Sequence, residues 1–306
     1  MKHLISLFLI GLYLLPPKQT LSQNSPVSVS FLREIPSQEQ TEFKLSSPTA
    51  LSIDAEGNIF ILDAGANRLV KLNPKGEFIA AVGGLGWNPE EFDQPEDLAI
   101  KSQLNIFVAD YNNKRIQRYD NHLNFISLLV SDVDTPSDLE FSFPSGIDIS
   151  RHGELFIADK ESDRALKLNS FGQLMLIFGD YNSGEGQIQD AGKIEVDGND
   201  LVYVSDVGAG EVALFDYFGN FIARIGAGIL KRPGGVFIYK QHLFVTDEEN
   251  HNVNIFDPAH QHLFSWGAKG DKIGAFLRPV DIAVFNNQLF VLDADNNRIQ
   301  IFQLKM

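Results

Sequence analysis

The chain has 306 residues, with 25 Lys and Arg against 40 Asp and Glu, a net charge of −15 and no cysteine. The missing thiols exclude disulfide scaffolds, thiolate metal sites and cysteine catalysis. The acidic balance argues against a nucleic-acid partner, because such binding relies on basic contacts to phosphate. The length suffices for one large β domain or for two ordinary domains.

The first residues have the pattern of a secretory signal peptide. Lys2 precedes an apolar run over residues 4–15, which is too short to cross a bilayer, since a spanning helix needs about 20 residues. The small residues Thr20 and Ser22 fit a cleavage site after Ser22. We expect a signal peptide at residues 1–22 and an exported domain, periplasmic or extracellular, at residues 23–306 with no membrane span. The alternative is a retained N-terminal anchor.

One supersecondary unit then recurs six times, at intervals of roughly 47 residues. In each copy an apolar strand ends in Asp, a polar turn follows, and a second apolar strand begins. A strand that usually starts with Pro precedes this pair, and a fourth strand follows a Gly or Asn turn, as at residues 78–82. The six repeated aspartates are Asp63, Asp110, Asp159, Asp206, Asp247 and Asp293.

Four strands per copy predict an all-β fold, a six-bladed β-propeller of four-stranded antiparallel blades. The sixth copy lacks its fourth strand, whereas residues 31–35 (FLREI) echo residues 221–225 (FIARI). We therefore expect residues 29–35 to pair with residues 299–304. The ring would then be closed by the N-terminal strand in the last blade, without open sheet edges.

The repeat resembles the NHL-repeat family of six-bladed β-propellers. The resemblance rests on the Pro-led strand, the strand ending in Asp, the N-x-R turn and the following apolar-Gln-apolar strand, matched best at residues 110–120 and 293–302. It extends over residues 27–306. Because family members are mostly binding platforms, it implies that role. Six-bladed relatives also include calcium-dependent lactonases and a zinc-dependent lyase that completes the amidation of peptides.

Several roles of relatives do not fit this chain. Relatives in ubiquitin transfer carry a RING domain, which needs cysteine, and relatives that grip RNA use basic faces. A zinc site needs several converging histidines, but only His251 lies in a turn on the face opposite the other histidines of the domain. We expect a monomeric, non-catalytic binding platform for a protein, peptide or glycan. The alternative is a divalent-metal hydrolase or lyase at the channel mouth.

The repeated Asp is open to two interpretations, a metal ligand or a turn cap. A carboxylate at a strand end accepts backbone N–H groups of the next turn, and an Arg five residues later, such as Arg115, can pair with it. Six copies favour the structural role. Glu211 and Asn252 replace this Arg in copies four and five, so these turns are held differently or that sector is free for a partner.

The first strand of each copy should face the central channel. The third residues of these six strands are Ala50, Asp97, Gly146, Lys193, Gly235 and Asp281. The residues two positions later are Ser52, Ala99, Asp148, Glu195, Phe237 and Ala283. These positions predict a negative channel mouth with space left by the small residues. The carboxylates either cap strand amides while Lys193 pairs with a neighbour, or Asp97, Asp281 and Asp148 or Glu195 hold Ca²⁺ or a cationic ligand group. No other cofactor is expected.

Aromatic residues fall into two groups. The phenylalanines of the strand that ends in Asp, such as Phe60 and Phe156, share one register and are expected in the core between blades. Trp266 in a closing strand is expected there too. Trp87 lies in a long connection between copies, where it either packs under its own loop or is exposed as an anchor for a partner.

Overall fold

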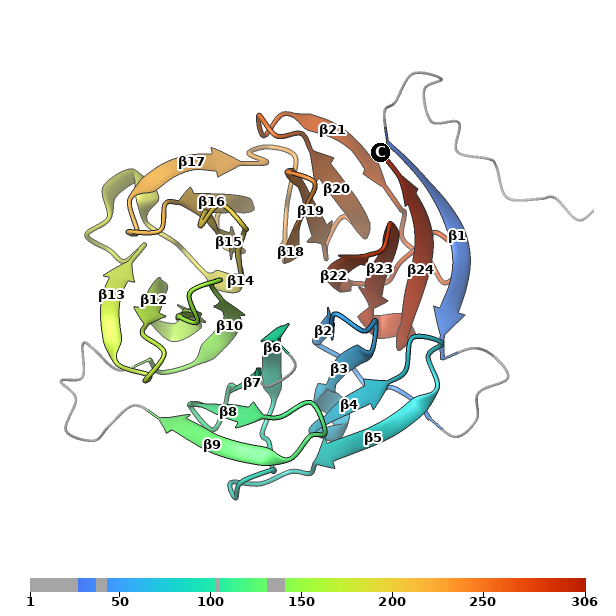
Figure 1. Ribbon diagram of the computed structural model, residues 1–306. Helices are drawn as coiled ribbons and strands as arrows, with labels where there is room; N and C mark the ends of the chain where they lie inside the picture. Colours follow the sequence, from blue (N-terminus) through green and yellow to red (C-terminus); the bar gives the residue numbers. More distant parts are fainter. Residues whose placement is uncertain (1–26, 37–42, 103–104, 131–140) are drawn as a thin grey trace, which may run out of the picture.

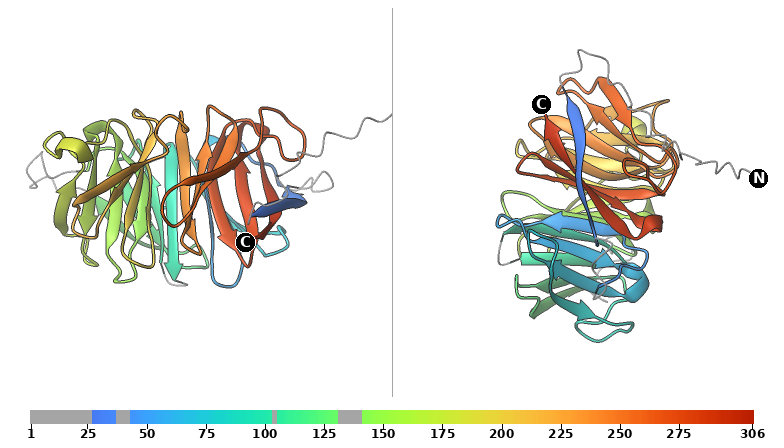
Figure 2. Two further views of the ribbon diagram at one scale, coloured as in Figure 1. Left: turned by 90° about the horizontal axis from the view of Figure 1, so that it is seen from above. Right: turned by 90° about the vertical axis from the view of Figure 1, so that its right-hand side faces the viewer.

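The computed structural model describes residues 27–36, 43–102, 105–130 and 141–306. The expected signal peptide at residues 1–22 lies outside the described residues. The described chain forms six four-stranded antiparallel sheets arranged as the blades of a propeller around a central channel (Figure 1). Seen edge-on, the ring is a flat disc (Figure 2). Within the described ranges no helix is long and apolar enough to cross a membrane.

In five blades the strands follow one another in chain order from the channel outward, and blade 6 is the exception. Blade 1 is β2–β5 (Ala50–Ile53, Ile59–Asp63, Arg68–Leu72, Phe78–Gly83) and blade 2 is β6–β9 (Pro95–Ser102, Asn105–Asp110, Arg115–Tyr119, Phe125–Val130). Blade 3 is β10–β13 (Pro144–Ile149, Leu155–Asp159, Arg164–Leu168, Leu174–Phe178) and blade 4 is β14–β17 (Ala191–Val196, Val202–Asp206, Glu211–Phe215, Phe221–Ile225). Blade 5 is β18–β21 (Pro233–Tyr239, His242–Asp247, Asn252–Phe256, His262–Trp266).

Blade 6 contains both ends of the described chain. Its inner strands are β22 (Pro279–Phe285), β23 (Gln288–Asp293) and β24 (Arg298–Lys305), and its outer strand is β1 (Ser28–Ile35). β1 runs antiparallel to β24, with Val29 opposite Leu304 and Ile35 opposite Ile299, and the two strands lie side by side in Figure 1. The expected closure by the N-terminal strand is confirmed.

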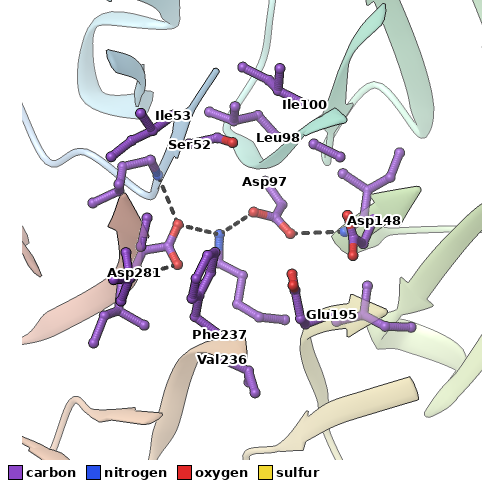
Figure 3. A pocket seen from close by; sticks show the side chains of 18 residues that line it. Ser52, Ile53, Asp97, Leu98, Ile100, Asp148, Glu195, Val236, Phe237 and Asp281 are labelled. Carbon is purple, nitrogen blue, oxygen red and sulfur yellow. Dashed lines mark hydrogen bonds and ion pairs between the residues drawn. The ribbon is translucent and has the colours of Figure 1, made fainter. Parts of the chain in front are cut away.

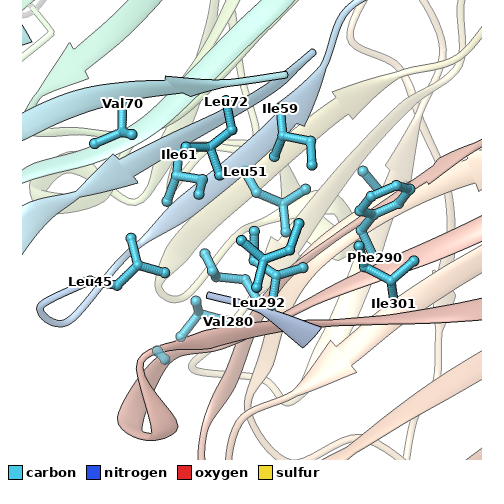
Figure 4. Packing of buried hydrophobic residues seen from close by; sticks show 14 of the residues in the cluster. Leu45, Leu51, Ile59, Ile61, Val70, Leu72, Val280, Phe290, Leu292 and Ile301 are labelled. Atoms are coloured by element: carbon cyan, nitrogen blue, oxygen red, sulfur yellow. The ribbon is translucent and has the colours of Figure 1, made fainter. Parts of the chain in front are cut away.

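The hydrophobic core consists of six clusters, one between each pair of adjacent blades. The cluster between blades 6 and 1 packs β-branched and leucine side chains of blade 1, such as Ile59 and Val70, against Phe290 and Ile301 of blade 6 (Figure 4). Trp266 is buried, as expected, with its ring centroid 4.4 Å from that of Phe302. Successive side chains of a strand point to opposite faces of the blade and therefore enter two different clusters. In β3, Ile59 and Ile61 lie between blades 6 and 1, and Phe60 and Leu62 lie between blades 1 and 2.

The repeated aspartates are fully buried and hold the connection that enters their own blade. Asp110, for example, accepts the backbone N–H of Asp93 at 2.8 Å and Nε of Arg115 at 2.7 Å. The expectation that these carboxylates cap the next turn needs correction, because their backbone donors lie mainly 15 to 17 residues upstream in the chain. Each Asp therefore fixes an inter-blade connection above the channel.

The turn after each repeated Asp ends in a left-handed residue, which explains its Asn, Asp and Gly content. The six residues are Asn67, Lys114, Asp163, Gly210, His251 and Asn297, with φ between 47° and 67°. Short polar residues and Gly adopt this conformation at the least cost. Asn67 Oδ1 and Asn297 Oδ1 also accept a backbone N–H of the next blade, from Gln94 and Ser47. His251 Nδ1 does the same for Arg278, so its role here is structural.

Candidate functional site: the central channel

Two cavities lie along the central channel, and Lys193 lines both of them. The upper funnel, about 730 Å³, opens on the face that carries the inter-blade connections and the turns after the repeated aspartates. The lower chamber, about 230 Å³, lies between the later residues of the six first strands. Lys193 separates the two cavities, because it is the third residue of its strand and reaches across the axis.

The ammonium group of Lys193 is held by three blades other than its own. Its Nζ donates to Asp97 Oδ1 at 2.6 Å, to the carbonyl of Glu96 at 2.8 Å and to the carbonyl of Thr49 at 3.0 Å. Asp281 Oδ2 lies 4.0 Å away on the other side (Figure 3). The three hydrogen bonds use all three N–H groups of the ammonium.

The surroundings of this cluster shift the pKa values of Asp97, Lys193 and Asp281. Burial raises the pKa of Asp97 and raises the pKa of Asp281 to about 6, although the Lys193 ammonium lowers both. Burial also lowers the pKa of Lys193, but Asp97 and Asp281 outweigh it and the net shift is upward. The cluster therefore keeps Lys193 charged, with Asp97 as its nearest counter-ion.

The channel aspartates also connect adjacent blades. Asp97 accepts the backbone N–H of Ile147 at 2.9 Å, Asp148 that of Val196 at 2.7 Å, and Asp281 that of Leu51 at 2.8 Å. Each of these bonds runs from one first strand to the first strand of the next blade. The carboxylates thus cap strand amides, which was the structural alternative for these positions.

The expected space is present beside the small residues Ser52, Ala99 and Ala283, which line the lower chamber, but it is absent beside the two glycines of the third position. A Cβ at Gly146 would lie 2.5 Å from the carbonyl oxygen of Gly192, and a Cβ at Gly235 would lie 2.4 Å from Asp281 Oδ1. Glycine is required there because neighbouring first strands approach closely. The open space lies above and below this level, in the upper funnel and the lower chamber.

The Asp97–Asp281 pair does not fit a calcium ion in this arrangement. The Lys193 ammonium already lies between the two carboxylates, and their other contacts are backbone amides. Calcium needs six to eight oxygen ligands. In the part of the chain that the structure describes, no group of three or more His, Cys, Asp or Glu is placed to hold a metal ion.

The structure brings five of the six predicted site residues together. Asp97, Asp148, Lys193, Glu195 and Asp281 all line the lower chamber (Figure 3). Trp87 lies apart, on the connection from β5 to β6, and it is 68% exposed rather than packed under its loop. The loop itself is held firmly, because Arg115 Nη1 donates to the Trp87 carbonyl at 2.5 Å.

The polar lining of the upper funnel was not predicted. It contains Tyr111 and Lys160, which directly follow a repeated Asp, and Arg232 and Arg278, which directly precede the proline of a first strand. The repeat spacing alone places these two positions at the channel entrance in every copy, so they were detectable. Burial raises the pKa of Glu96 in the same wall, with Lys193 and Lys160 opposing the shift.

Comparisons with known protein families agree with this architecture. A family model described as "6-bladed beta-propeller" matches residues 18–146. A second model, described as "NHL repeat", matches residues 276–302, which contain β22, β23 and the first part of β24. The chain thus carries a six-bladed β-propeller domain and an NHL repeat.

Individual relatives match part of the chain. A probable peptidyl-alpha-hydroxyglycine alpha-amidating lyase of Caenorhabditis elegans is 28% identical over 123 residues, which is 38% of this chain and 35% of the lyase. Human NHL repeat-containing protein 3 is 32% identical over 80 residues, 25% of this chain and 23% of that protein. This chain therefore spans only about a third or less of these relatives.

A structure of streptogramin B lyase superposes with a TM-score of 0.62 at 13% identity, covering 92% of this chain and 88% of the lyase chain. At this level of identity the similarity shows the fold alone.

Proposed function

We propose that this chain is an exported, monomeric binding platform without catalytic activity, whose upper funnel receives part of a protein, peptide or glycan. The observation that carries the proposal is the funnel itself. Side chains or backbone of all six blades line this cavity of about 730 Å³, which falls in the size range of ligand pockets. The lining includes charged and polar side chains and lies on the face where connections converge on a rigid ring, the usual place for recognition.

Exposed apolar side chains on the same connections support this proposal. They are Leu85 (72% exposed), Trp87 (68%), Tyr181 (83%) and Ile273 (61%). Leu85 and Trp87 belong to the β5–β6 connection, Tyr181 to β13–β14 and Ile273 to β21–β22. Aromatic and apolar side chains on a fixed backbone are effective anchors for a partner. A polar funnel surrounded by such side chains suits a ligand that inserts one group and rests on the rim.

The test is binding of the labelled protein to peptide and glycan arrays. Val207 lines the funnel, so Val207→Trp should fill part of it and abolish binding to the recognised spots. Ile222→Trp is the matched control, since Ile222 is 48% exposed on the outer strand of the same blade, and it should bind like the wild type. The proposal fails if the wild type recognises no spot, or if Val207→Trp binds unchanged.

A second candidate function is that of a divalent-metal hydrolase or lyase at the channel mouth. Its support is the similarity to the amidating lyase of Caenorhabditis elegans over 38% of this chain. Elemental analysis of the purified protein separates the two candidates. Zinc or calcium bound at a stoichiometric level favours the enzyme, and array binding that persists in metal-free protein favours the platform.

A further inference from the structure

Arg232 and Arg278 occupy equivalent positions in blades 5 and 6. Each directly precedes the proline that begins a first strand, and both line the upper funnel. Their backbones are fixed, because the N–H of Arg232 donates to Asp247 Oδ1 at 3.2 Å and the N–H of Arg278 donates to His251 Nδ1 at 3.1 Å. The repeat thus places two arginines on neighbouring sectors of one cavity wall.

The guanidinium groups are oriented but only partly used. Nε of Arg232 donates to Glu248 at 3.1 Å, and Nε of Arg278 donates to Asp295 at 2.8 Å. Within the described residues neither arginine has a partner for its terminal nitrogens, Nη1 and Nη2. In Arg115, by contrast, Nη1 and Nη2 donate to three carbonyls of the connection below. Each funnel arginine therefore keeps the outer edge of its fork for another acceptor.

The local charge also differs from that of the whole chain. Lys160 and Lys193 line the same funnel, together with the carboxylates Asp93, Glu96 and Glu248. Glu248 already accepts from Arg232, and Asp93 accepts from Asn112 Nδ2 at 3.0 Å. Four cationic side chains and three carboxylates thus line one cavity of a protein whose net charge is −15. Because Lys160 pairs with Asp190 at 3.2 Å and Lys193 with Asp97 at 2.6 Å, the two arginines are the cationic side chains that offer hydrogen bonds to a ligand.

We propose that the upper funnel binds an oxyanion group of a ligand, a carboxylate or a phosphate, through the Nη atoms of Arg232 and Arg278. Guanidinium forks match these planar or tetrahedral oxyanions with paired hydrogen bonds. Fixing each fork by its Nε and backbone removes part of the ordering cost of binding. The inference rests on the proposed function and names the chemical class of the group that the funnel receives.

The test is calorimetric titration of the full chain with inorganic phosphate and with citrate, at constant ionic strength set by chloride. The wild type should bind at least one of these anions saturably. Arg232→Gln/Arg278→Gln should weaken that binding at least about tenfold, the loss expected for about 1.4 kcal/mol or more. The matched control is Lys231→Gln/Lys269→Gln, which removes two charges from the same two connections outside the funnel and should change affinity by less than about twofold.

Two results overturn the inference: no saturable binding of either anion by the wild type at millimolar concentrations, or equal binding by the double arginine variant. Preference for citrate assigns a carboxylate, and preference for phosphate assigns a phosphate ester or free phosphate. If both anions fail while Val207→Trp still abolishes array binding, the oxyanion inference is wrong and the platform proposal stands.

Discussion

Arg224 shows how blade 4 replaces a missing side chain. In blades 1, 2 and 6, Nε of the Arg that begins the third strand donates to the repeated Asp at 2.7 to 2.9 Å. Blade 4 has Glu211 at that position, and Nη1 of Arg224 from the outer strand β17 pairs with Asp206 at 2.6 Å instead. In blade 5 no arginine side chain of the described residues pairs with Asp247, and Asn250 and backbone amides bind this carboxylate instead. These two turns are therefore held differently from the rest.

This exchange predicts a rescue. Arg224→Gln should leave Asp206, which is fully buried, without its charged partner and lower the free energy of unfolding by about 2–3 kcal/mol. Glu211→Arg in the same chain restores the repeat's usual arginine and should recover most of that loss. Urea denaturation of the wild type, the single variant and the double variant measures both effects. Equal stability of the single and double variants would contradict the replacement.

Asp281 should make the stability depend on pH. Its pKa is about 6 in the folded protein against 3.8 unfolded, so the folded state takes up a proton first as the pH falls. Between these values the contribution of Asp281 to the free energy of unfolding should rise as the pH falls, by up to about 1.4 kcal/mol per pH unit. Above pH 6 this contribution is lost.

Asp281→Asn removes this titration. The stability of the wild type relative to Asp281→Asn should therefore increase from pH 7 to pH 5, as measured by urea denaturation at each pH. A difference that stays constant over this range would show that Asp281 does not titrate there.

At the scale of strands, β1 closes the ring. It pairs with β24 along Ser28–Ile35, and Glu34 lies 3.0 Å from Arg298, which in turn holds Asp293. Ile35 packs into the cluster between blades 1 and 6, and Val27 into the cluster between blades 5 and 6. The strand thus covers two interfaces as well as one sheet edge.

Removing residues 27–36 should cost several kcal/mol, a large part of the roughly 5–15 kcal/mol that stabilises a domain, because buried apolar surface and a whole sheet edge become exposed. The comparison is between chains starting at residue 23 and at residue 37, by thermal denaturation. Melting temperatures within a few degrees of each other would show that β1 contributes little to closure.

The repeat predicted the strands well and the site incompletely, for one physical reason. Two features of the sequence, the alternation of apolar residues within each copy and the number of copies, predict the strands. From them follow the strand order, the register of Phe60 and Phe156, and the closing role of residues 29–35. The contacts across the channel depend on distances between copies. Equivalent positions of the repeat lie at equal distances from the propeller axis, which predicted that Asp97, Lys193 and Asp281 share one ring. This argument did not show that the side chain of Lys193 would cross the axis. Nor did it show that the neighbouring first strands would occupy the space beside Gly146 and Gly235.

At the scale of the whole ring, Lys193 is a central tie. It starts from blade 4 and contacts Thr49 of blade 1, Glu96 and Asp97 of blade 2, and Asp281 of blade 6. Three Asp-to-amide bonds add connections between adjacent first strands. The blades are therefore joined at the axis by polar contacts as well as by the apolar clusters farther out.

Substitutions at Lys193 and Asp97 should show how much this ion pair contributes to the free energy of unfolding. Lys193→Met leaves the buried Asp97 carboxylate without a counter-ion and should destabilise the fold by about 3–5 kcal/mol. Adding Asp97→Asn removes the unpaired charge, keeps an oxygen for the N–H of Ile147, and should restore most of the stability. Denaturation midpoints of the four proteins of this cycle give the coupling. A Lys193→Met variant as stable as the wild type would show that the tie is dispensable.

The seam in blade 6 also bears on how the protein is made. β1 is synthesised some 270 residues before its partner β24. At typical translation rates this delay is on the order of tens of seconds. During that time blades 1 to 5 can form one after another, while β1 has no sheet to join. The pairing of β1 with β24 therefore follows the synthesis of blades 1 to 5, and until then the hydrogen-bonding edges of β1 have no partner strand in the domain.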